Sequence, residues 1–307
     1  MSTITGDSPG ALESPGADAA GSKRAKPQHP PHHLPDEPLV VVQPSDTWAA
    51  VNYRDLWEYR ELLYFLTWRD LKVRYKQTAL GMTWVVMQPL LNTVIFTVFL
   101  GRLANVPSDG TPYPLFAYAG LLLWTFFSGA VSTGSNSLVG NAHLITKVYF
   151  PRLIIPVANI AARLPDFAIA FVILVGMMFY YGVFPRWGVL MMPACLALML
   201  LLALGLGMAS SALNVKYRDV GVVMPLLLQL WMFTSPVVYS SSMIPPAWRR
   251  LYELNPMVGI LQGFRAAMLG GVFDWEALAV STAITLALLV AAAFWFRRME
   301  TRLADIV

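Results

Sequence analysis

Charged side chains are scarce in this 307-residue sequence, since Asp, Glu, Lys and Arg together make up 13% of it. Soluble domains contain about a quarter charged residues, so this composition excludes an ordinary soluble protein. Cysteine occurs once, at Cys195 within an apolar run, which excludes an intrachain disulfide and predicts a small core residue. The first 20 residues hold no apolar segment, so we expect no cleavable secretory signal.

Motifs that bind nucleotides or metals, or that activate a nucleophile, are also missing. The sequence has no GxxxxGK[ST] phosphate loop, no HExxH, no CxxC and no GxSxG. These absences argue against an enzyme and against ATP hydrolysis by this chain. His29, His32 and His33 stand between prolines in a polar segment, and we interpret them as part of a tail, so no metal site is predicted.

Long stretches without charge take the place of such motifs. Each reaches the roughly 20 helical residues needed to cross a hydrocarbon core about 30 Å thick. Because a lipid-exposed backbone must satisfy its own hydrogen bonds, helices are the expected spanning elements. We therefore predict an all-α polytopic membrane protein with six transmembrane helices. The charge-free stretches are residues 77–101, 110–146, 167–185, 187–215, 220–248 and 277–296.

The distribution of basic residues orients the predicted helices. If the N-terminus is cytoplasmic and six helices alternate, 16 Lys and Arg lie inside and five outside. The positive-inside rule then predicts both termini in the cytoplasm. The predicted membrane domain covers residues 79–297, and residues 298–307 form a cytoplasmic tail after it. The predicted spans are about Leu80–Leu100, Leu115–Leu138, Leu153–Phe179, Val189–Leu213, Val222–Tyr239 and Ala277–Phe296.

Two segments precede the first span. Residues 1–47 are rich in proline, glycine, serine and alanine, and we expect a disordered cytoplasmic tail. Residues 53–78 carry a polar stripe on an otherwise aromatic and aliphatic surface. That pattern is typical of an amphipathic helix in the headgroup plane, and packing on a soluble partner would give it too. Its basic residues are expected to meet anionic lipid headgroups or a lipid pyrophosphate, namely Arg69, Lys72, Arg74 and Lys76.

The third predicted span contains two opposite charges. Arg163 and Asp166 are three residues apart, so they share a helical face and can pair. Because charges inside a membrane usually pair, we interpret them as an intramembrane ion pair with a structural role in preference to a translocation site.

The segment between the fifth and sixth predicted spans is neither a loop nor a full span. Within it, Met257–Leu269 is apolar but too short to cross a bilayer. Gly259 and Gly263 lie one helical turn apart, which would let this piece press against a neighbouring helix. We expect re-entrant helices here, at the outer end of the pathway that the protein encloses.

Several short motifs follow one another along the chain: RYKQTALGMTW at 74–84, QPL at 88–90, YRD at 217–219, SPVVY at 235–239, IP at 244–245, NP at 255–256 and Arg265. Over residues 53–297 the chain resembles ABC transporter permeases that export polysaccharides. The resemblance implies a homodimer that works with two copies of a separate ATPase, which binds ATP and Mg. It implies export of lipid-linked O-antigen, teichoic acid or capsular polysaccharide across the bacterial inner membrane. O-antigen is the substrate that we expect, and no nucleic-acid partner is predicted.

The resemblance also assigns roles to segments. The connection after the second span corresponds to a coupling helix at 141–150 that docks on the ATPase. Its predicted contact residues are His143, Lys147, Tyr149 and Arg152, although the positive-inside rule alone would explain the two basic ones. Short helices at 246–270 correspond to the outer gate, with Pro246, Trp248, Asn255 and Arg265. The first and fifth spans line the conduit, and we predict its aromatic side chains to be Trp84, Phe96, Phe99, Trp231, Phe233 and Tyr239.

Other functions stay open at this point. A permease of the same architecture would serve for a drug or a plain lipid. An integral-membrane glycan transferase would need catalytic groups at one membrane face, where the outer loops offer only scattered acidic residues, Asp109, Glu253, Asp274 and Glu276. A passive channel is disfavoured because rings of charge are missing.

Overall fold

The computed structural model describes residues 57–76, 81–147 and 150–303. These residues belong to one unit, 48–307, and within them the chain forms helices and no strand. The predicted all-α fold class is therefore confirmed. The expected disordered tail at 1–47, together with Tyr149 and residues 304–307, lies outside the described residues.

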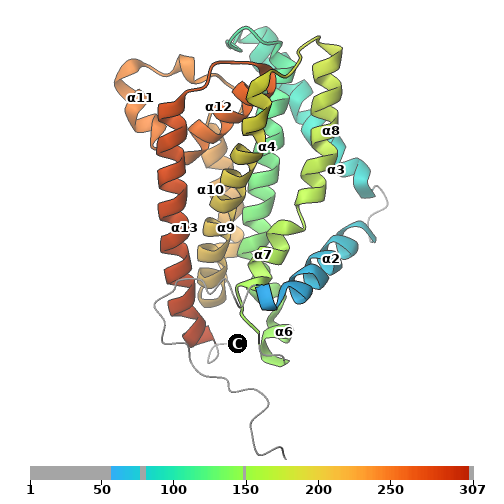
Figure 1. The fold of residues 1–307 in the computed structure, drawn as a ribbon, viewed down its shortest axis with the longest axis vertical. Helices are drawn as coiled ribbons and strands as arrows, with labels where there is room; N and C mark the ends of the chain where they lie inside the picture. The colour runs from blue at the N-terminus through green and yellow to red at the C-terminus, as the bar shows by residue number, and fades with distance from the viewer. Residues whose placement is uncertain (1–56, 77–80, 148–149, 304–307) are drawn as a thin grey trace, which may run out of the picture. The chain divides into compact units, whose positions relative to one another are not determined.

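Within the described residues, five helical segments are long and apolar enough to cross a membrane: Thr83–Leu103, Tyr113–Ser135, Ile154–Tyr180, Trp187–Lys216 and Trp275–Met299. They run side by side in Figure 1. The elements that form them are α3 (Gly81–Phe96) with the π-helix η1 (Thr97–Leu103), α4 (Tyr113–Ser135), α7 (Ile154–Ala161) with α8 (Leu164–Tyr180), η2 (Trp187–Met191) with α9 (Met192–Lys216), and α13 (Trp275–Leu303).

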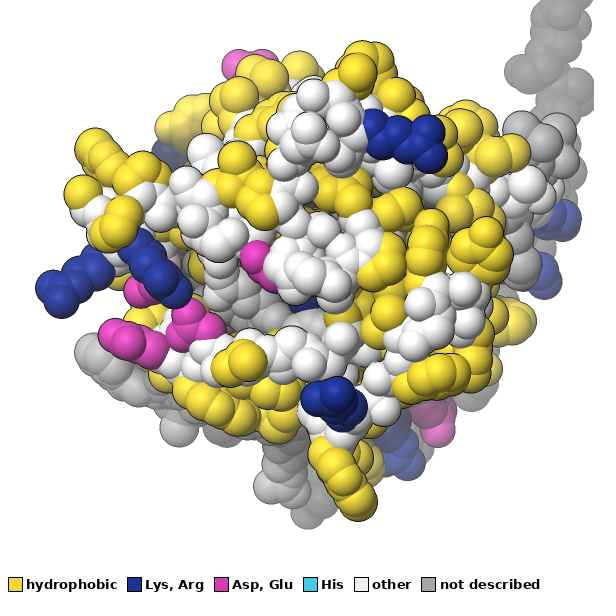
Figure 2. Space-filling model, turned by 90° about the horizontal axis from the view of Figure 1, so that it is seen from above, with side chains coloured by type: hydrophobic (Ala, Val, Ile, Leu, Met, Phe, Trp, Pro, Cys, Tyr) yellow, Lys and Arg dark blue, Asp and Glu magenta, His cyan; other side chains and the backbone are white. Residues whose placement is uncertain are grey.

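The remaining helices are shorter, and all but α10, which runs beside α4 and α9 within the bundle, lie at its two ends. They are α2 (Arg60–Lys76), α5 (Ser137–Gly140), α6 (Ala142–Lys147), α10 (Val220–Phe233), η3 (Ser241–Met243), α11 (Pro246–Glu253) and α12 (Pro256–Leu269). Figure 1 places α2, α6 and the last turns of α13 at one end, named here the α6 end. It places α11 and α12 at the opposite end, the α11 end. Figure 2 views the α11 end, where hydrophobic side chains surround a centre of polar and backbone atoms.

Helix α4 is the centre of the packing. Of its 23 residues, 17 are buried, whereas only 11% of the first span's apolar window is buried. Small residues let α9 approach it closely, because a Cβ added to Gly134 would lie 3.1 Å from the Cα of Gly207. Cys195 is buried in the same core, as its apolar surroundings in the sequence predict.

The third span has the predicted extent but is broken into α7 and α8. Pro165 stands at the start of α8, where it has no backbone N–H to offer the carbonyl of Ala161. The backbone therefore turns at Ala162 and Arg163, and the N–H of Arg163 bonds the carbonyl of Ile160 at 3.0 Å. The predicted extent of the span is confirmed, and the break at Ala162 and Arg163 is an additional feature of the structure.

The fifth predicted span is shorter than expected. Helix α10 ends at Phe233, so its 14 residues fall short of the roughly 20 that a full crossing needs. Pro236 explains the early end, because a proline lacks the N–H that would continue the helix and disfavours helical backbone at the preceding residue, Ser235. The SPVVY motif is thus a turn after the helix, not part of it.

The segment between α10 and α13 forms two helices that differ in burial. Almost all of α12 is buried, whereas α11 has no buried residue. Gly259 permits this burial: its N–H donates to Ser281 Oγ at 3.1 Å, and an added Cβ would collide with the carbonyl of Ala277. The close approach that the Gly259–Gly263 spacing predicts is therefore present, against α13.

We expect Gly120→Ala to destabilise the protein. A Cβ at Gly120 of α4 would overlap the Val237 carbonyl oxygen and the Arg265 guanidinium, both held by buried contacts. Overpacking of this kind costs about 1–3 kcal/mol. The matched control is Gly176→Ala in α8, where nothing lies within 4 Å. Unfolding titrations of the purified proteins measure both changes, and equal stability of the two variants would contradict the packing described here.

Candidate functional site

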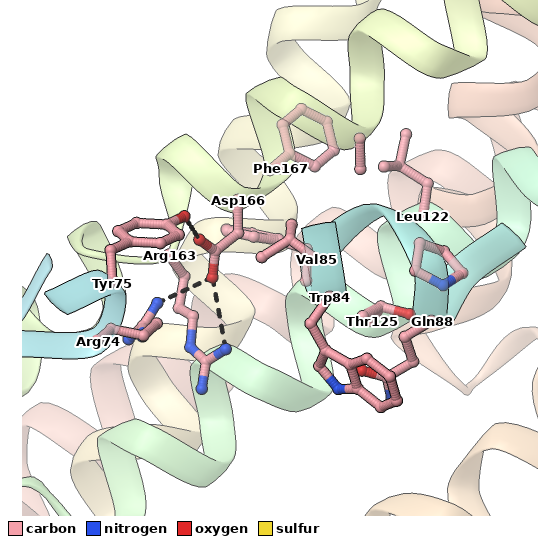
Figure 3. A pocket seen from close by; sticks show the side chains of 13 residues that line it. Arg74, Tyr75, Trp84, Val85, Gln88, Leu122, Thr125, Arg163, Asp166 and Phe167 are labelled. Carbon is pink, nitrogen blue, oxygen red and sulfur yellow. Dashed lines mark hydrogen bonds and ion pairs between the residues drawn. The ribbon is translucent and has the colours of Figure 1, made fainter. Parts of the chain in front are cut away.

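A cavity of about 450 Å³ opens between α2, α3, α4 and α8, and we name it the Asp166 pocket. Figure 3 shows Arg74, Tyr75 and Arg163 converging on Asp166, with Trp84 and Gln88 across the cavity. The residues that line it are Arg74, Tyr75, Trp84, Val85, Gln88, Pro89, Leu122, Thr125, Phe126, Arg163, Asp166, Phe167 and Ala170.

Three side chains bind the carboxylate of Asp166. Arg74 Nη1 lies 2.8 Å from Oδ2 and Arg163 Nη1 lies 3.5 Å from the same atom. The hydroxyl of Tyr75 donates to Oδ1. Burial and this hydrogen bond both raise the pKa of Tyr75, so its hydroxyl keeps its proton at neutral pH. The sequence suggests only the Arg163–Asp166 pair, whereas the structure adds two residues from α2.

The break between α7 and α8 positions this cluster. Arg163 is the residue before α8, and Asp166 lies in the first turn of that helix, where a negative charge is favoured by the helix dipole. Arg74 also donates to the carbonyl of Ala162 at 3.1 Å, beside the break. Gly129 of α4 leaves room for the guanidinium of Arg163, since an added Cβ would lie 3.3 Å from its Nη1.

The basic residues predicted to meet lipid headgroups separate into two pairs. Lys72 and Lys76 are exposed on α2. Arg69 and Arg74 instead turn toward the protein, because Arg69 bonds Asp70 and also donates to Asn141 Oδ1 at 2.6 Å. The four residues therefore do not form one surface patch.

At the α6 end, the predicted coupling segment is a six-residue helix, α6. His143 and Lys147 are exposed on it, while Leu144 and Ile145 pack against the apolar cluster beneath. Arg152 is half-buried, and Tyr149 lies outside the described residues. The Arg69–Asn141 hydrogen bond ties the start of this helix to α2.

A buried polar contact that the sequence analysis missed joins three elements near α6. The side chain of Asn214, in α9, donates to the Ser135 carbonyl at 3.0 Å and to Asn136 Oδ1 at 3.1 Å. Its Oδ1 accepts from the N–H of Gly221, in the first turn of α10, at 3.0 Å. The available signal was an amide residue in an otherwise apolar helix, since such residues bond across helices in membranes.

At the α11 end, Arg265 of α12 holds the turn that follows α10. It is buried, and it donates to the Pro236 carbonyl at 2.6 Å and to the Val237 carbonyl at 2.5 Å. Its guanidinium lies 3.7 Å from the centre of the Phe116 ring, within cation–π range. The hydroxyl of Tyr113 donates to the next carbonyl, Val238, at 2.7 Å.

A second cavity, of about 520 Å³, lies beneath α11, and we name it the Trp248 pocket. Asn255 organises it: its Oδ1 accepts from Trp231 Nε1 and from the Met257 N–H, both at 3.0 Å. The hydroxyl of Tyr252 donates to that of Tyr239 at 3.2 Å. The lining residues are Trp231, Thr234, Ile244, Pro245, Trp248, Leu251, Tyr252, Asn255 and Pro256.

The structure brings some of the predicted conduit and gate residues together and separates others. Trp231 meets the gate residue Asn255, whereas the Tyr239 hydroxyl accepts from Tyr252 and donates to the Phe233 carbonyl at 3.1 Å. Trp84 instead lines the Asp166 pocket. The remaining members line neither pocket: Phe96 packs on the core, Phe99 and Phe233 are exposed side chains, and Pro246 is exposed at the start of α11.

Comparison with known proteins gives consistent matches. Residues 61–269 match a family described as "ABC-2 type transporter". The chain is 32% identical to the O-antigen export system permease protein RfbA of Myxococcus xanthus, over 82% of this chain and 97% of that protein. It is 28% identical to a Klebsiella pneumoniae protein of the same name, over 80% and 95%. The polysialic acid transport protein KpsM of Escherichia coli is 22% identical, over 66% and 79%.

We expect Arg265→Lys to weaken the α11 end. One ammonium cannot reproduce the forked contact to two carbonyls together with the stacking on Phe116. Loss of a buried hydrogen bond from a charged group costs about 1.5–3 kcal/mol. Arg250→Lys on exposed α11 makes the same chemical change on the surface and should leave the free energy of unfolding within about 0.5 kcal/mol of wild type. Chemical unfolding of the purified proteins compares the two, and a stable Arg265→Lys variant would show that the clamp is dispensable.

Proposed function

We propose that this chain, which belongs to the ABC-2 type transporter family, is the membrane subunit of a transporter that exports a lipid-linked polysaccharide across the bacterial inner membrane. O-antigen is the substrate class that the relatives favour. The observation that carries the proposal is the similarity to the Myxococcus xanthus O-antigen export permease, which extends over 97% of that protein.

The energy for transport comes from a partner in this scheme. The sequence contains no phosphate loop, so a separate ATPase must bind ATP and Mg and hydrolyse the nucleotide. Helix α6 supports a docking role, because it exposes His143 and Lys147 while its apolar face is anchored in the protein. A displacement of α6 would be transmitted to α10 through the α4–α5 junction and the hydrogen bonds of Asn214.

Two copies of the chain would enclose the conduit, with two ATPase copies on the cytoplasmic side. In this arrangement α10 and the turn after it make the sixth crossing, and both termini are cytoplasmic. The α6 end then faces the cytoplasm and the α11 end faces outward, which the distribution of basic residues supports. Helices α3 and α10 are proposed to line the conduit, since both leave most of their apolar side chains uncovered within the chain.

The outer end offers suitable chemistry for a sugar chain. The Trp248 pocket combines indole and phenol rings with the amide of Asn255. Flat rings with polar edges can contact the apolar faces of successive sugars without fixing their sequence. We propose that this pocket and α11 guide the polymer at its exit.

Glycan transfer by the chain itself is disfavoured because the acidic side chains at the α11 end are held in ion pairs and hydrogen bonds. Glu253 and Asp274 both face Arg249, at 3.2 and 3.7 Å. Asp109 accepts hydrogen bonds from Ser240 and Ser242. These carboxylates are engaged in structural contacts and do not form a pair set for acid–base catalysis.

The purified protein alone should hydrolyse no ATP. Co-expression with its partner ABC ATPase should give a complex with ATPase activity, and deletion of this gene should leave the lipid-linked polymer on the cytoplasmic face. Phosphate release and polymer accessibility to an added glycosidase provide the measurements. Intrinsic ATPase activity in this chain, or normal surface polymer in the deletion strain, would contradict the proposal.

Trp248→Ala should slow export by about two- to tenfold, because it removes one aromatic contact that contributes roughly 0.5–1.5 kcal/mol. Trp187→Ala is the matched control, because Trp187 is 89% exposed and lines neither pocket. Surface polymer in a complemented deletion strain, normalised to the amount of protein in the membrane, reports the effect. If the two variants export equally well, the Trp248 pocket has no part in guiding the polymer.

A further inference from the structure

We propose that the Asp166 pocket binds a membrane lipid whose headgroup carries an anionic phosphate. This goes beyond the transport function, because it assigns a ligand to a cavity that one copy of the chain forms without an ATPase or a polysaccharide. The charge, shape and position of the pocket support this assignment.

The charges in the pocket favour an anion. Two guanidinium groups, of Arg74 and Arg163, face one carboxylate, Asp166, which leaves a net positive charge among the described lining residues. The Nε of Arg163 has no hydrogen-bond partner within the described part of the chain. A guanidinium fork matches the oxygens of a phosphate, and each such hydrogen bond is stronger than one between neutral groups.

Other lining residues supply further hydrogen-bond donors on the opposite wall of the cavity. The amide of Gln88 and the hydroxyl of Thr125 lie across the cavity from the arginines. Phosphate offers several acceptor oxygens, so one of them can bind Arg163 while another takes donors from the α3 and α4 walls. The indole of Trp84 closes this side and is 54% exposed, as expected for a side chain at a lipid-facing opening.

The remaining lining is apolar and suits a hydrocarbon chain. Leu122 and Phe126 come from α4, and Phe167 and Ala170 come from α8. These residues continue from the charged cluster along the helices, so the cavity has a basic head and an apolar body. Its volume of about 450 Å³ holds a headgroup with the first part of an acyl or prenyl chain, within the usual range of about 300–1,000 Å³ for ligand sites.

The position of the pocket selects a lipid over a soluble anion. Helix α3 forms one wall, and it is the least covered of the candidate spans, with 11% of its window buried. The span that contains α8 is 28% buried. An occupant can therefore enter sideways from the bilayer, between two helices that the chain leaves exposed. Helix α2 contributes Arg74 and Tyr75 to the lining, and Trp68 and Val73 are exposed on the same helix.

Asp166 acts as the internal competitor of the ligand. When the pocket holds no anion, the Asp166 carboxylate pairs with Arg74 and Arg163. This pairing avoids two unpaired like charges in a poorly hydrated site. A phosphate must share these arginines with it. Removal of the carboxylate should therefore strengthen binding, whereas removal of either arginine should weaken it.

The experiment titrates the purified full-length protein in detergent with dioleoylphosphatidylglycerol and measures bound lipid by native mass spectrometry. Arg74→Gln should weaken binding about tenfold, and Asp166→Asn should tighten it by several-fold. Arg69→Gln is the matched control on the same helix, because Arg69 also pairs with an aspartate but does not line the pocket. It should bind phosphatidylglycerol like the wild type. Thermal unfolding of each variant checks that it is folded.

Opposite effects of Arg74→Gln and Asp166→Asn cannot result from a general loss of structure, so they support the site. Equal effects of Arg74→Gln and Arg69→Gln would mean that only nonspecific attraction of basic residues to the surface is present, and would overturn it. Parallel titrations with undecaprenyl phosphate and inorganic phosphate identify which molecule carries the bound phosphate. Tighter binding of either lipid than of inorganic phosphate supports the site. Binding of inorganic phosphate as tight as that of the lipids overturns the lipid assignment. Because no step depends on export, failure here leaves the transport proposal standing.

Discussion

The structure depends on one constraint: a backbone carbonyl in a poorly hydrated environment needs a hydrogen-bond donor wherever a helix is interrupted. Prolines interrupt helices at two places, Pro165 and Pro236. Beside each break, an arginine from another element donates to backbone carbonyls of the turn. Arg74 bonds the carbonyl of Ala162, and Arg265 bonds those of Pro236 and Val237. The two breaks are therefore stable features of the fold and not defects.

The same arginines create the two chemically distinctive regions of the protein. At the α11 end, Arg265 fixes the turn after α10, beside the Trp248 pocket that lies under α11. Between α2 and α8, Arg74 meets Asp166 and opens a cavity with a basic head and an apolar body. Burying a guanidinium is costly unless its donors are used, so these positions commit the local structure to one arrangement.

Communication between the two ends has a physical route in the packing. Helix α4 runs through the centre of the unit and contacts the elements of both regions. Near α6, its end is tied to α9 and α10 by the amide of Asn214. Near α11, Gly120 of α4 packs directly on the Arg265 clamp. A displacement of α6 by an ATPase would thus act on a helix that also supports the outer turn.

The sequence alone determined the all-helical membrane character and the extent of most spans, because charge-free length is a property of composition along the chain. It also determined the family, through motifs that stay in order. Tertiary structure decided where the fifth span ends and the third breaks. Pro89 and Pro225 lie inside helices, whereas Pro165 and Pro236 stand at breaks, so the presence of a proline does not by itself show where a helix ends. Tertiary structure also decided that Arg74 and Tyr75 meet Asp166, 92 and 91 residues away along the chain, and that Trp84 faces them. Such contacts depend on how helices pack, and no local pattern specifies that packing.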